Sequence, residues 1–133
     1  MGDKPTIVVA TNNLGKLKEF ALLLPNFKII SQSSLNITPE EELGETFFEN
    51  SLQKARVANN ASGMVSLGDD SGLIVPALNN LPGLRSARYA HENATDEENR
   101  QHLRKELEAL DLDQTQAYFV CVLVLVQASA DPF

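Results

Sequence analysis

The fold is decided by residues 7–24, which read IVVATNNLGKLKEFALLL. The first four residues are apolar and mostly β-branched, so they predict a short buried strand. Apolar residues then recur at helical spacing from Leu14 to Leu24, and Pro25 predicts the end of that helix. A strand that leads directly into a helix is the basic unit of an α/β protein.

The same alternation of strand and helix continues along the chain. Short apolar runs predict further strands at residues 27–30, 64–67, 73–75 and 117–126. Two capping boxes, which begin at Thr46 and Thr95, predict the starts of two more helices, and Gly63 predicts the end of the first. The chain is therefore predicted to be a single α/β domain over residues 1–133.

The apolar pattern also predicts how these elements pack. The helix after Thr46 is expected to bury Phe48, Leu52, Ala55 and Ala58, and the helix after Thr95 is expected to bury Leu103, Leu107 and Leu110. Residues 117–126 are apolar at both alternating sets of positions, which predicts a central strand covered on both faces, with Cys121 in the core. Residues 81–84 predict a type II turn, with proline second and glycine third.

Composition limits the classes of function. The 133 residues carry 11 Lys and Arg against 18 Asp and Glu, a net charge of −7, and 43% of them are hydrophobic. Nucleic-acid polymers require clustered basic residues, so they are not expected partners. The longest apolar stretch is too short to cross a membrane, and the chain opens without an apolar signal segment. A single cysteine fits a reducing compartment, so a cytoplasmic location is expected.

The loop between the first strand and the first helix is one candidate site. Its residues are Thr11, Asn12, Asn13, Leu14, Gly15 and Lys16. A helix N-terminus presents unpaired peptide N–H groups that bind anions, and Lys16 adds a positive charge suited to phosphate. The loop lacks the glycine pattern of a P-loop. Its residues are also compatible with ordinary capping by Asn13, followed by a solvated lysine.

Acidic residues in two other segments form a second candidate site. Glu40, Glu41 and Glu42 lie in one loop, while Asp69 and Asp70 lie between strand-like runs, where Asp is uncommon. Carboxylates beside a phosphate need a bridging cation, and Mg²⁺ is the hard ion that joins carboxylates to phosphate oxygens. The alternative is that the glutamates are surface charge and that residues 69–72 form a tight turn.

Taken together, these segments resemble the inosine triphosphate pyrophosphatase family, which hydrolyses aberrant purine nucleoside triphosphates such as ITP, dITP and XTP. The resemblance rests on five segments in register: residues 10–20, 41–50 with 54–56, 69–73, 81–83 with 86–89, and 94–96. It implies an α/β fold with a mixed central sheet, flanking helices and a cleft at the strand ends. It also implies a magnesium-dependent, homodimeric enzyme that releases the nucleoside monophosphate and pyrophosphate.

The resemblance assigns roles to individual residues. The catalytic residues of the family fall on four positions: Lys16, Glu42, Asp69 and Asp70. Its substrate contacts fall on the loop of residues 11–16, where Asn13 and Lys16 are the phosphate-contacting side chains, and on two further residues, Lys54 and Ser71. Magnesium is implied to bind Glu41 and Asp70, and Asp70 is implied to accept the proton from water.

Three features depart from the family pattern. Asn12 stands where glycine is usual, and Asn79-Asn80 replaces a glycine pair. Family members continue well beyond the position of Phe133, and that continuation holds the purine base. The resemblance therefore implies the N-terminal two thirds of the family fold, truncated before the base pocket and expected to self-associate. The alternative is a non-catalytic nucleotide- or phosphate-binding module, which magnesium-dependent release of pyrophosphate would exclude.

Overall fold

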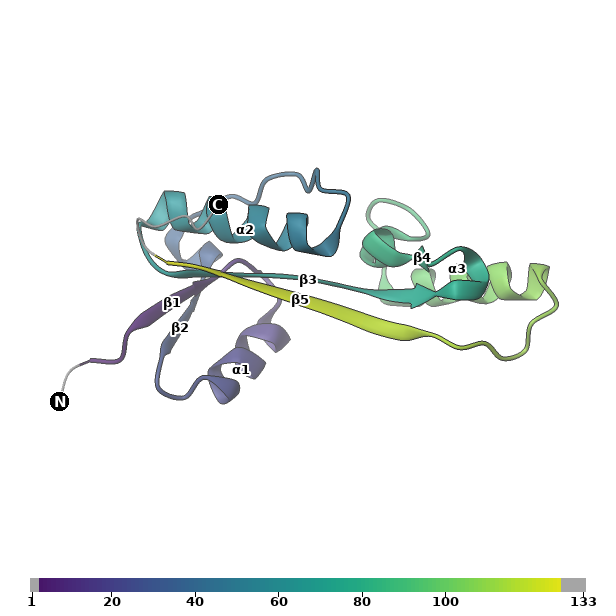
Figure 1. Ribbon diagram of the computed structural model, residues 1–133, viewed down its shortest axis with the longest axis horizontal. Coiled ribbons are helices and arrows are strands. Elements are labelled where there is room, and N and C mark those ends of the chain that lie inside the picture. The colour runs from purple at the N-terminus through teal and green to yellow at the C-terminus, as the bar shows by residue number, and fades with distance from the viewer. Residues whose placement is uncertain (1–2, 128–133) are drawn as a thin grey trace. The chain divides into compact units, whose positions relative to one another are not determined.

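The computed structural model describes residues 3–127, and its helices and strands alternate along the chain (Figure 1). The elements are β1 (Thr6–Val9), α1 (Leu14–Leu23), β2 (Lys28–Ser31), α2 (Phe47–Ser62), β3 (Ser66–Val75), β4 (Leu81–Pro82), α3 (Asp96–Ala109) and β5 (Tyr118–Val126), with short 3-10 turns at Gln32–Leu35, Pro76–Leu78 and Gly83–Arg88. The chain forms two compact units, one of residues up to Asp70 together with those from Val122 onward, and one of Ser71–Cys121.

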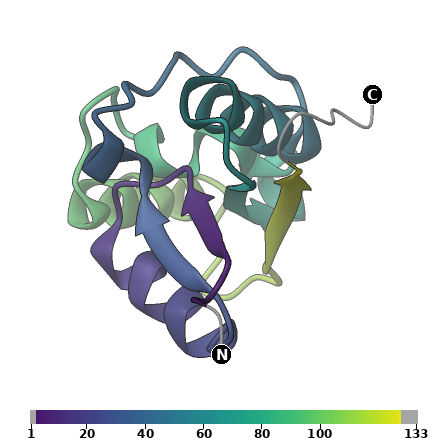
Figure 2. The same ribbon diagram turned by 90° about the vertical axis from the view of Figure 1, so that its left-hand side faces the viewer.

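The first unit is built around β1, which pairs in parallel with β2 and with the start of β3. Side chains of β1 alternate between two faces, as strand geometry requires. Ile7 and Val9 pack with Phe20 of α1, whereas Val8 and Ala10 pack with Ala58 of α2. The two helices therefore cover opposite faces of the sheet, as Figure 2 shows. The predicted α/β fold class is confirmed.

The ends of α2 follow the predicted signals, but its buried stripe differs at one position. The Thr46 side chain accepts a hydrogen bond from the Glu49 amide, and Gly63 ends the helix in the left-handed region, at φ 69°. Leu52, Ala55 and Ala58 are buried as predicted, but Phe48 is 43% exposed. The prediction for Phe48 is wrong because it lies in the first turn of the helix, ahead of the part that packs on the sheet.

The prediction of two separate strands, at residues 64–67 and 73–75, is wrong. The structure has one continuous strand, β3, which runs through this segment from Ser66 to Val75. Asp69 and Asp70 are accordingly buried in the middle of the strand rather than exposed at a turn. The interpretation of these aspartates as turn residues is therefore excluded.

The second unit contains β4, α3 and the later part of β3. The capping box at Thr95 is confirmed, because Thr95 and Glu98 each accept a hydrogen bond from the other's amide. Leu103 and Leu107 are only half-buried and Leu110 is 50% exposed, so the predicted buried stripe of α3 is wrong at Leu110. A type II turn at residues 81–84 is also wrong, because Pro82 has ψ −19° instead of the extended value that this turn requires.

The last strand, β5, pairs with β3 and buries only one set of its side chains (Figure 1). Val124 and Val126 pack against Leu52 and Ala55 of α2. The alternate side chains are exposed, to 80% for Phe119, and Cys121 is exposed as well. The expectations of cover on both faces and of a core cysteine are wrong for the described residues. Within residues 3–127, no helix has both the length and the apolar character that crossing a membrane requires.

Candidate active site

Two adjacent aspartates of β3 place carboxylates on opposite faces of the strand, because successive side chains of a strand alternate. Asp69 lies on the α1 face, where its Oδ2 is 2.5 Å from the Nζ atom of Lys16. Asp70 lies on the α2 face, where its Oδ1 is 3.4 Å from the Nζ atom of Lys54. Both carboxylates are nearly inaccessible, with exposed fractions of 4% and 9% for their side chains. Each buried charge thus has a lysine partner from a different helix.

Lys16 reaches Asp69 from the first turn of α1, where the preceding loop is held by local hydrogen bonds. The Asn13 side chain accepts a hydrogen bond from the Lys16 amide at 3.1 Å, and the Thr11 hydroxyl accepts one from the Asn13 amide at 3.1 Å. The predicted capping role of Asn13 is confirmed. Capping leaves the loop accessible, since Asn12, Leu14 and Gly15 are exposed. The helix N-terminus is therefore open to an anion on the side that carries Lys16.

The acidic loop is fastened to α2 by three side chains of that helix. Glu49 accepts a hydrogen bond from the Glu45 amide at 2.8 Å, and Asn50 accepts one from the Gly44 amide at 2.7 Å. Gln53 accepts a hydrogen bond from the Leu43 amide at 3.2 Å and donates one to the Glu41 carbonyl oxygen at 2.6 Å. The backbone is thereby held on both sides of Glu42.

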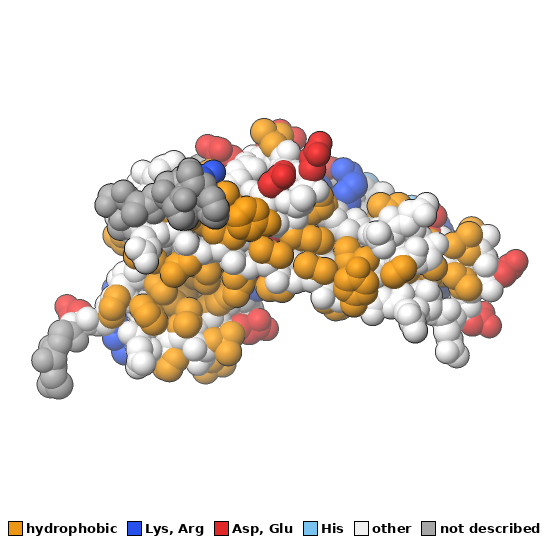
Figure 3. Space-filling view, in the orientation of Figure 1, with side chains coloured by type: hydrophobic (Ala, Val, Ile, Leu, Met, Phe, Trp, Pro, Cys, Tyr) orange, Lys and Arg blue, Asp and Glu red, His pale blue; other side chains and the backbone are white. Residues whose placement is uncertain are grey.

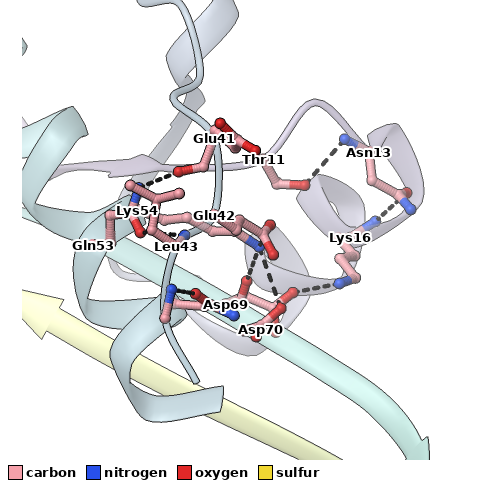
Figure 4. Close-up of polar contacts among 12 residues, drawn as sticks. Thr11, Asn13, Lys16, Glu41, Glu42, Leu43, Gln53, Lys54, Asp69 and Asp70 are labelled. Carbon is pink, nitrogen blue, oxygen red and sulfur yellow. Dashed lines mark hydrogen bonds and ion pairs between the residues drawn. The ribbon is translucent and has the colours of Figure 1, made fainter. Parts of the chain in front are cut away.

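Glu42 is the member of the acidic loop that joins the cluster around Asp70. Its Oε1 atom lies 2.7 Å from the Nζ atom of Lys54, which also donates a hydrogen bond to the Asp69 carbonyl oxygen at 3.0 Å. Figure 4 shows Glu42, Lys54 and both aspartates converging, while Glu41 contributes its backbone carbonyl to Gln53. The structure thus brings together five of the sequence-predicted residues: Lys16, Glu42, Lys54, Asp69 and Asp70.

Asn50 and Gln53 are functional candidates that sequence reasoning missed. Both belong to α2, where the polar residues Glu49, Asn50, Gln53 and Lys54 recur at helical spacing on one face. That spacing is the signal that could have found them, since a polar face beside an acidic loop has backbone amides to bind. Ser71 follows Asp70 on β3 and falls in the second unit.

Burial and charge act on Asp70 in opposite directions. Burial raises the pKa of the Asp70 carboxyl, and so does the Glu42 carboxylate, whereas the Lys54 ammonium and the Asn50 side chain lower it. Burial is the largest of these effects, so the pKa lies above its usual value. The second carboxylate oxygen, Oδ2, is buried and has no hydrogen-bond partner among residues 3–127. A carboxylate with a raised pKa and a spare acceptor atom can take up a proton.

The carboxylates of the site suit one kind of metal ion. No three His, Cys, Asp or Glu side chains within the described part of the chain are gathered in a way that could hold a metal. Mg²⁺ does not require such a cage, because it commonly binds one or two carboxylates together with water and substrate phosphates. The unpartnered Oδ2 of Asp70 and the facing acidic loop fit that requirement.

A larger hollow of about 900 Å³ runs along α2 and is lined by Glu40, Leu52 and Arg56, among others. Its lining includes neither Lys16 nor either aspartate of β3. A smaller hollow of about 60 Å³ is lined by Glu42 and Lys54. The buried charges therefore identify the candidate site better than the volume of a hollow does.

Comparison with known proteins is consistent with this architecture. Residues 7–133 match the sequence profile of the Ham1 family. A dITP/XTP pyrophosphatase of Haemophilus influenzae is 49% identical over 131 residues, which cover 97% of this chain and 67% of that protein. A dITP/XTP pyrophosphatase of Legionella pneumophila is 46% identical over 126 residues, which cover 95% of this chain and 65% of that protein.

Solved structures give the same result. A HAM1 protein from Coxiella burnetii superimposes with a TM-score of 0.88 at 43% identity, over 97% of this chain and 66% of that one. The Ham1 protein of Staphylococcus aureus superimposes with a TM-score of 0.81 at 39% identity, over 95% of this chain and 65% of that one. The chain thus spans about two thirds of the length of these relatives. Because the sequence profile matches nearly the whole chain and the fold is shared, the predicted resemblance is confirmed, and this chain belongs to the Ham1 family.

Proposed function

We propose that this site hydrolyses nucleoside triphosphates to the nucleoside monophosphate and pyrophosphate. The observation that carries the proposal is the pairing of two buried aspartates with two lysines, one of which stands at an exposed helix N-terminus. The proposed substrates are aberrant purine nucleotides such as ITP, dITP and XTP. Their support is the name dITP/XTP pyrophosphatase, which relatives at 49% and 46% identity carry.

The loop of residues 11–16 would bind the polyphosphate. The first peptide N–H groups of α1 are directed toward the loop, and the positive end of the helix dipole stabilises an anion there. Lys16 adds a positive charge that a ligand can reach, because 37% of its side chain is exposed even though its ammonium pairs with Asp69. Local hydrogen bonds to the side chains of Thr11 and Asn13 fix the backbone of this loop.

Asp70 and the acidic loop would hold Mg²⁺. Asp70 offers its unpartnered Oδ2 atom, and the ligands on the facing loop would be Glu41, as the family resemblance implies, and Glu42, which the geometry favours. When bound, Mg²⁺ supplies positive charge that screens the phosphate oxygens and stabilises the leaving pyrophosphate.

Asp70 would act as the general base. The carboxylate oxygen of Asp70 that does not bind the metal would accept the proton of a water molecule. The oxygen of that water forms a bond to the α-phosphorus, while the bond from the α-phosphorus to the oxygen bridging it to the β-phosphorus breaks. The electron pair of the broken bond leaves with pyrophosphate. Asp69 pairs with the Lys16 ammonium and so restrains the lysine of the phosphate loop. The family resemblance implies that Ser71 contacts the substrate.

The test is release of pyrophosphate from ITP, dITP and XTP with and without Mg²⁺, with ATP and GTP as reference substrates. We expect magnesium-dependent formation of equal amounts of nucleoside monophosphate and pyrophosphate. Release of inorganic phosphate instead would contradict attack at the α-phosphorus. Binding of nucleotide without turnover would favour a non-catalytic binding module.

The two glutamates of the acidic loop are expected to differ in effect. Glu42→Gln should lower turnover about tenfold or more at saturating Mg²⁺, because it removes the charge that pairs with Lys54 beside Asp70. Glu41→Gln leaves that pair intact and should mainly raise the Mg²⁺ concentration that gives half-maximal activity. Magnesium titrations of both variants measure this, and identical titration curves would contradict the separate roles.

We also propose that copies of this chain associate, in keeping with a homodimer. Exposed apolar side chains support it, since Leu123 and Leu125 both point from one face of β5, where Figure 3 shows hydrophobic surface. Large exposed apolar patches favour association. Light scattering after size-exclusion chromatography should show a species heavier than one chain, and Leu123→Ser with Leu125→Ser should shift it toward the monomer. A monomer at every concentration would contradict this prediction.

A further inference from the structure

The Lys54 ammonium is surrounded by oxygens of the kind that a divalent cation binds. Its Nζ atom lies 2.7 Å from Glu42 Oε1, 3.0 Å from the Asp69 carbonyl oxygen and 3.4 Å from Asp70 Oδ1. Carboxylate and carbonyl oxygens are the usual ligands of hard divalent cations. The ammonium therefore stands among three oxygens from two segments of the chain, the acidic loop and β3 (Figure 4).

The carboxylates around Lys54 have little contact with solvent, so they depend on a nearby positive charge. The side chains of Glu42 and Asp70 are only 22% and 9% exposed, so their carboxylates need a positive partner close by. The ammonium does not use every oxygen of the cluster, because Oδ2 of Asp70 is buried without a hydrogen-bond partner among residues 3–127. The oxygens that face the site thus offer more than a single ammonium satisfies.

We infer that Lys54 is the counter-cation of the metal-free site and that it gives way to a divalent cation. An ammonium and a divalent cation repel one another at contact distance, so they do not share the same carboxylates. The charge of lysine sits on a flexible four-carbon stem, which allows it to move away from the carboxylates while its backbone stays in α2. The released ammonium is then available to an anion, such as a phosphate of the substrate. This inference rests on the proposed function, because the cation is the one proposed there.

Lys16 provides a matched comparison. It also pairs with an aspartate of β3, but it does so from α1 and on the opposite face of the strand from Lys54. Lys16→Met and Lys54→Met each remove one positive charge that pairs with a neighbouring buried aspartate. Lys16→Met therefore shows how far the loss of any nearby positive charge changes the affinity for Mg²⁺. The additional change in Lys54→Met is the part that comes from the removal of an ammonium that Mg²⁺ must displace.

The experiment is calorimetric titration of the full chain with Mg²⁺, without nucleotide, at neutral pH. We expect Lys54→Met to bind Mg²⁺ about tenfold more tightly than the unaltered chain, because a competing cation is gone, and Lys16→Met to change affinity by less than about threefold. Equal or weaker binding by Lys54→Met would overturn the inference, as would equal gains in both variants. If the unaltered chain releases pyrophosphate but Lys54→Met binds no tighter, only this inference fails. If none of the three proteins binds Mg²⁺, both this inference and the proposed metal fail.

A second measurement uses the unaltered chain, because Lys54→Met leaves the buried Asp70 and the half-buried Glu42 without their counter-charge and is expected to be less stable. Lysine acylation is followed by mass spectrometry with and without saturating Mg²⁺, with the exposed Lys28 as internal reference. Mg²⁺ should raise the labelling of Lys54 relative to Lys28 at least about threefold, because the ammonium loses its carboxylate partners. Unchanged or reduced labelling of Lys54 would overturn the inference.

Discussion

Asp70→Asn is expected to lower magnesium-dependent release of pyrophosphate by at least about a hundredfold. The substitution keeps the size of the side chain and an oxygen that can accept the hydrogen bond from Lys54. It removes the group that takes up the proton of water and one of the charges proposed to hold Mg²⁺. Steady-state release of pyrophosphate from dITP at saturating Mg²⁺ measures the loss.

Asp113→Asn is the matched control, because Asp113 is exposed and is not one of the residues of the proposed site. It removes the same charge and should retain the activity of the unaltered chain. Activity of Asp70→Asn within a few-fold of this control would exclude Asp70 as the base.

The same substitution should raise stability at neutral pH. Because the pKa of Asp70 is raised in the folded protein, the folded state holds this proton more tightly than the unfolded state does. The contribution of Asp70 to the free energy of unfolding is therefore complete at a pH below its ordinary pKa of 3.8. That contribution is lost as the pH rises through the raised pKa of the folded state. Asp70→Asn removes that loss, so its thermal midpoint should exceed that of the unaltered chain at pH 7 without Mg²⁺. The two midpoints should converge below the ordinary pKa, and a lower midpoint for Asp70→Asn at pH 7 would contradict the sign of this shift.

Local signals in the sequence were sufficient for the first strand, the first helix and the caps. The apolar run before Asn13 forms β1, and the polar N-caps at Asn13, Thr46 and Thr95 each accept the hydrogen bond expected of them. These features depend on residues within one or two turns of each other, so a sequence pattern contains the whole interaction.

Which face of a strand is buried by residues far away in the sequence could not be predicted in the same way. Residues 118–126 are apolar at both sets of alternating positions, yet only one set is buried against α2. Periodicity identifies which side chains share a face, but it does not say what packs on that face. The same apolar pattern predicts Cys121 in the core, but this residue is exposed.

The residues of the candidate site were identified, but their pairing was not. Lys16 and Asp69 are 53 positions apart in sequence, and Lys54 and Asp70 are 16 apart. Only the parallel pairing of β1 with β3 brings the N-terminus of α1 beside the aspartates. The polar face of α2 indicates that Asn50 and Gln53 can bind a neighbouring segment, but their partners are backbone amides of the acidic loop, and amides do not differ from one residue to the next in sequence.

Gly68→Ala is expected to destabilise the chain by about 3 kcal/mol or more, which lowers the thermal midpoint by roughly 10 °C. A Cβ atom at Gly68 would lie 2.0 Å from the Ser51 carbonyl oxygen and 3.0 Å from the Ala55 backbone nitrogen. Both atoms belong to the backbone of α2, so no side-chain rotation relieves the overlap and the helix must move away from β3. Thermal unfolding and the Mg²⁺ dependence of activity measure the result.

Gly63→Ala is the control, because Gly63 has a left-handed φ of 69° but nothing within 4 Å of the added Cβ. It should cost only about 1 kcal/mol, from backbone strain alone. Equal losses of stability in the two variants would mean that the close packing of Gly68 against α2 does not contribute to the effect of Gly68→Ala. Gly68 precedes the two aspartates, and Lys54 lies one turn of α2 beyond Ser51. The close approach that glycine permits is therefore what brings the Lys54 ammonium to the Asp69 carbonyl and the Asp70 carboxylate. A glycine that resembles a turn signal in the sequence is instead the residue that lets the helix reach the site.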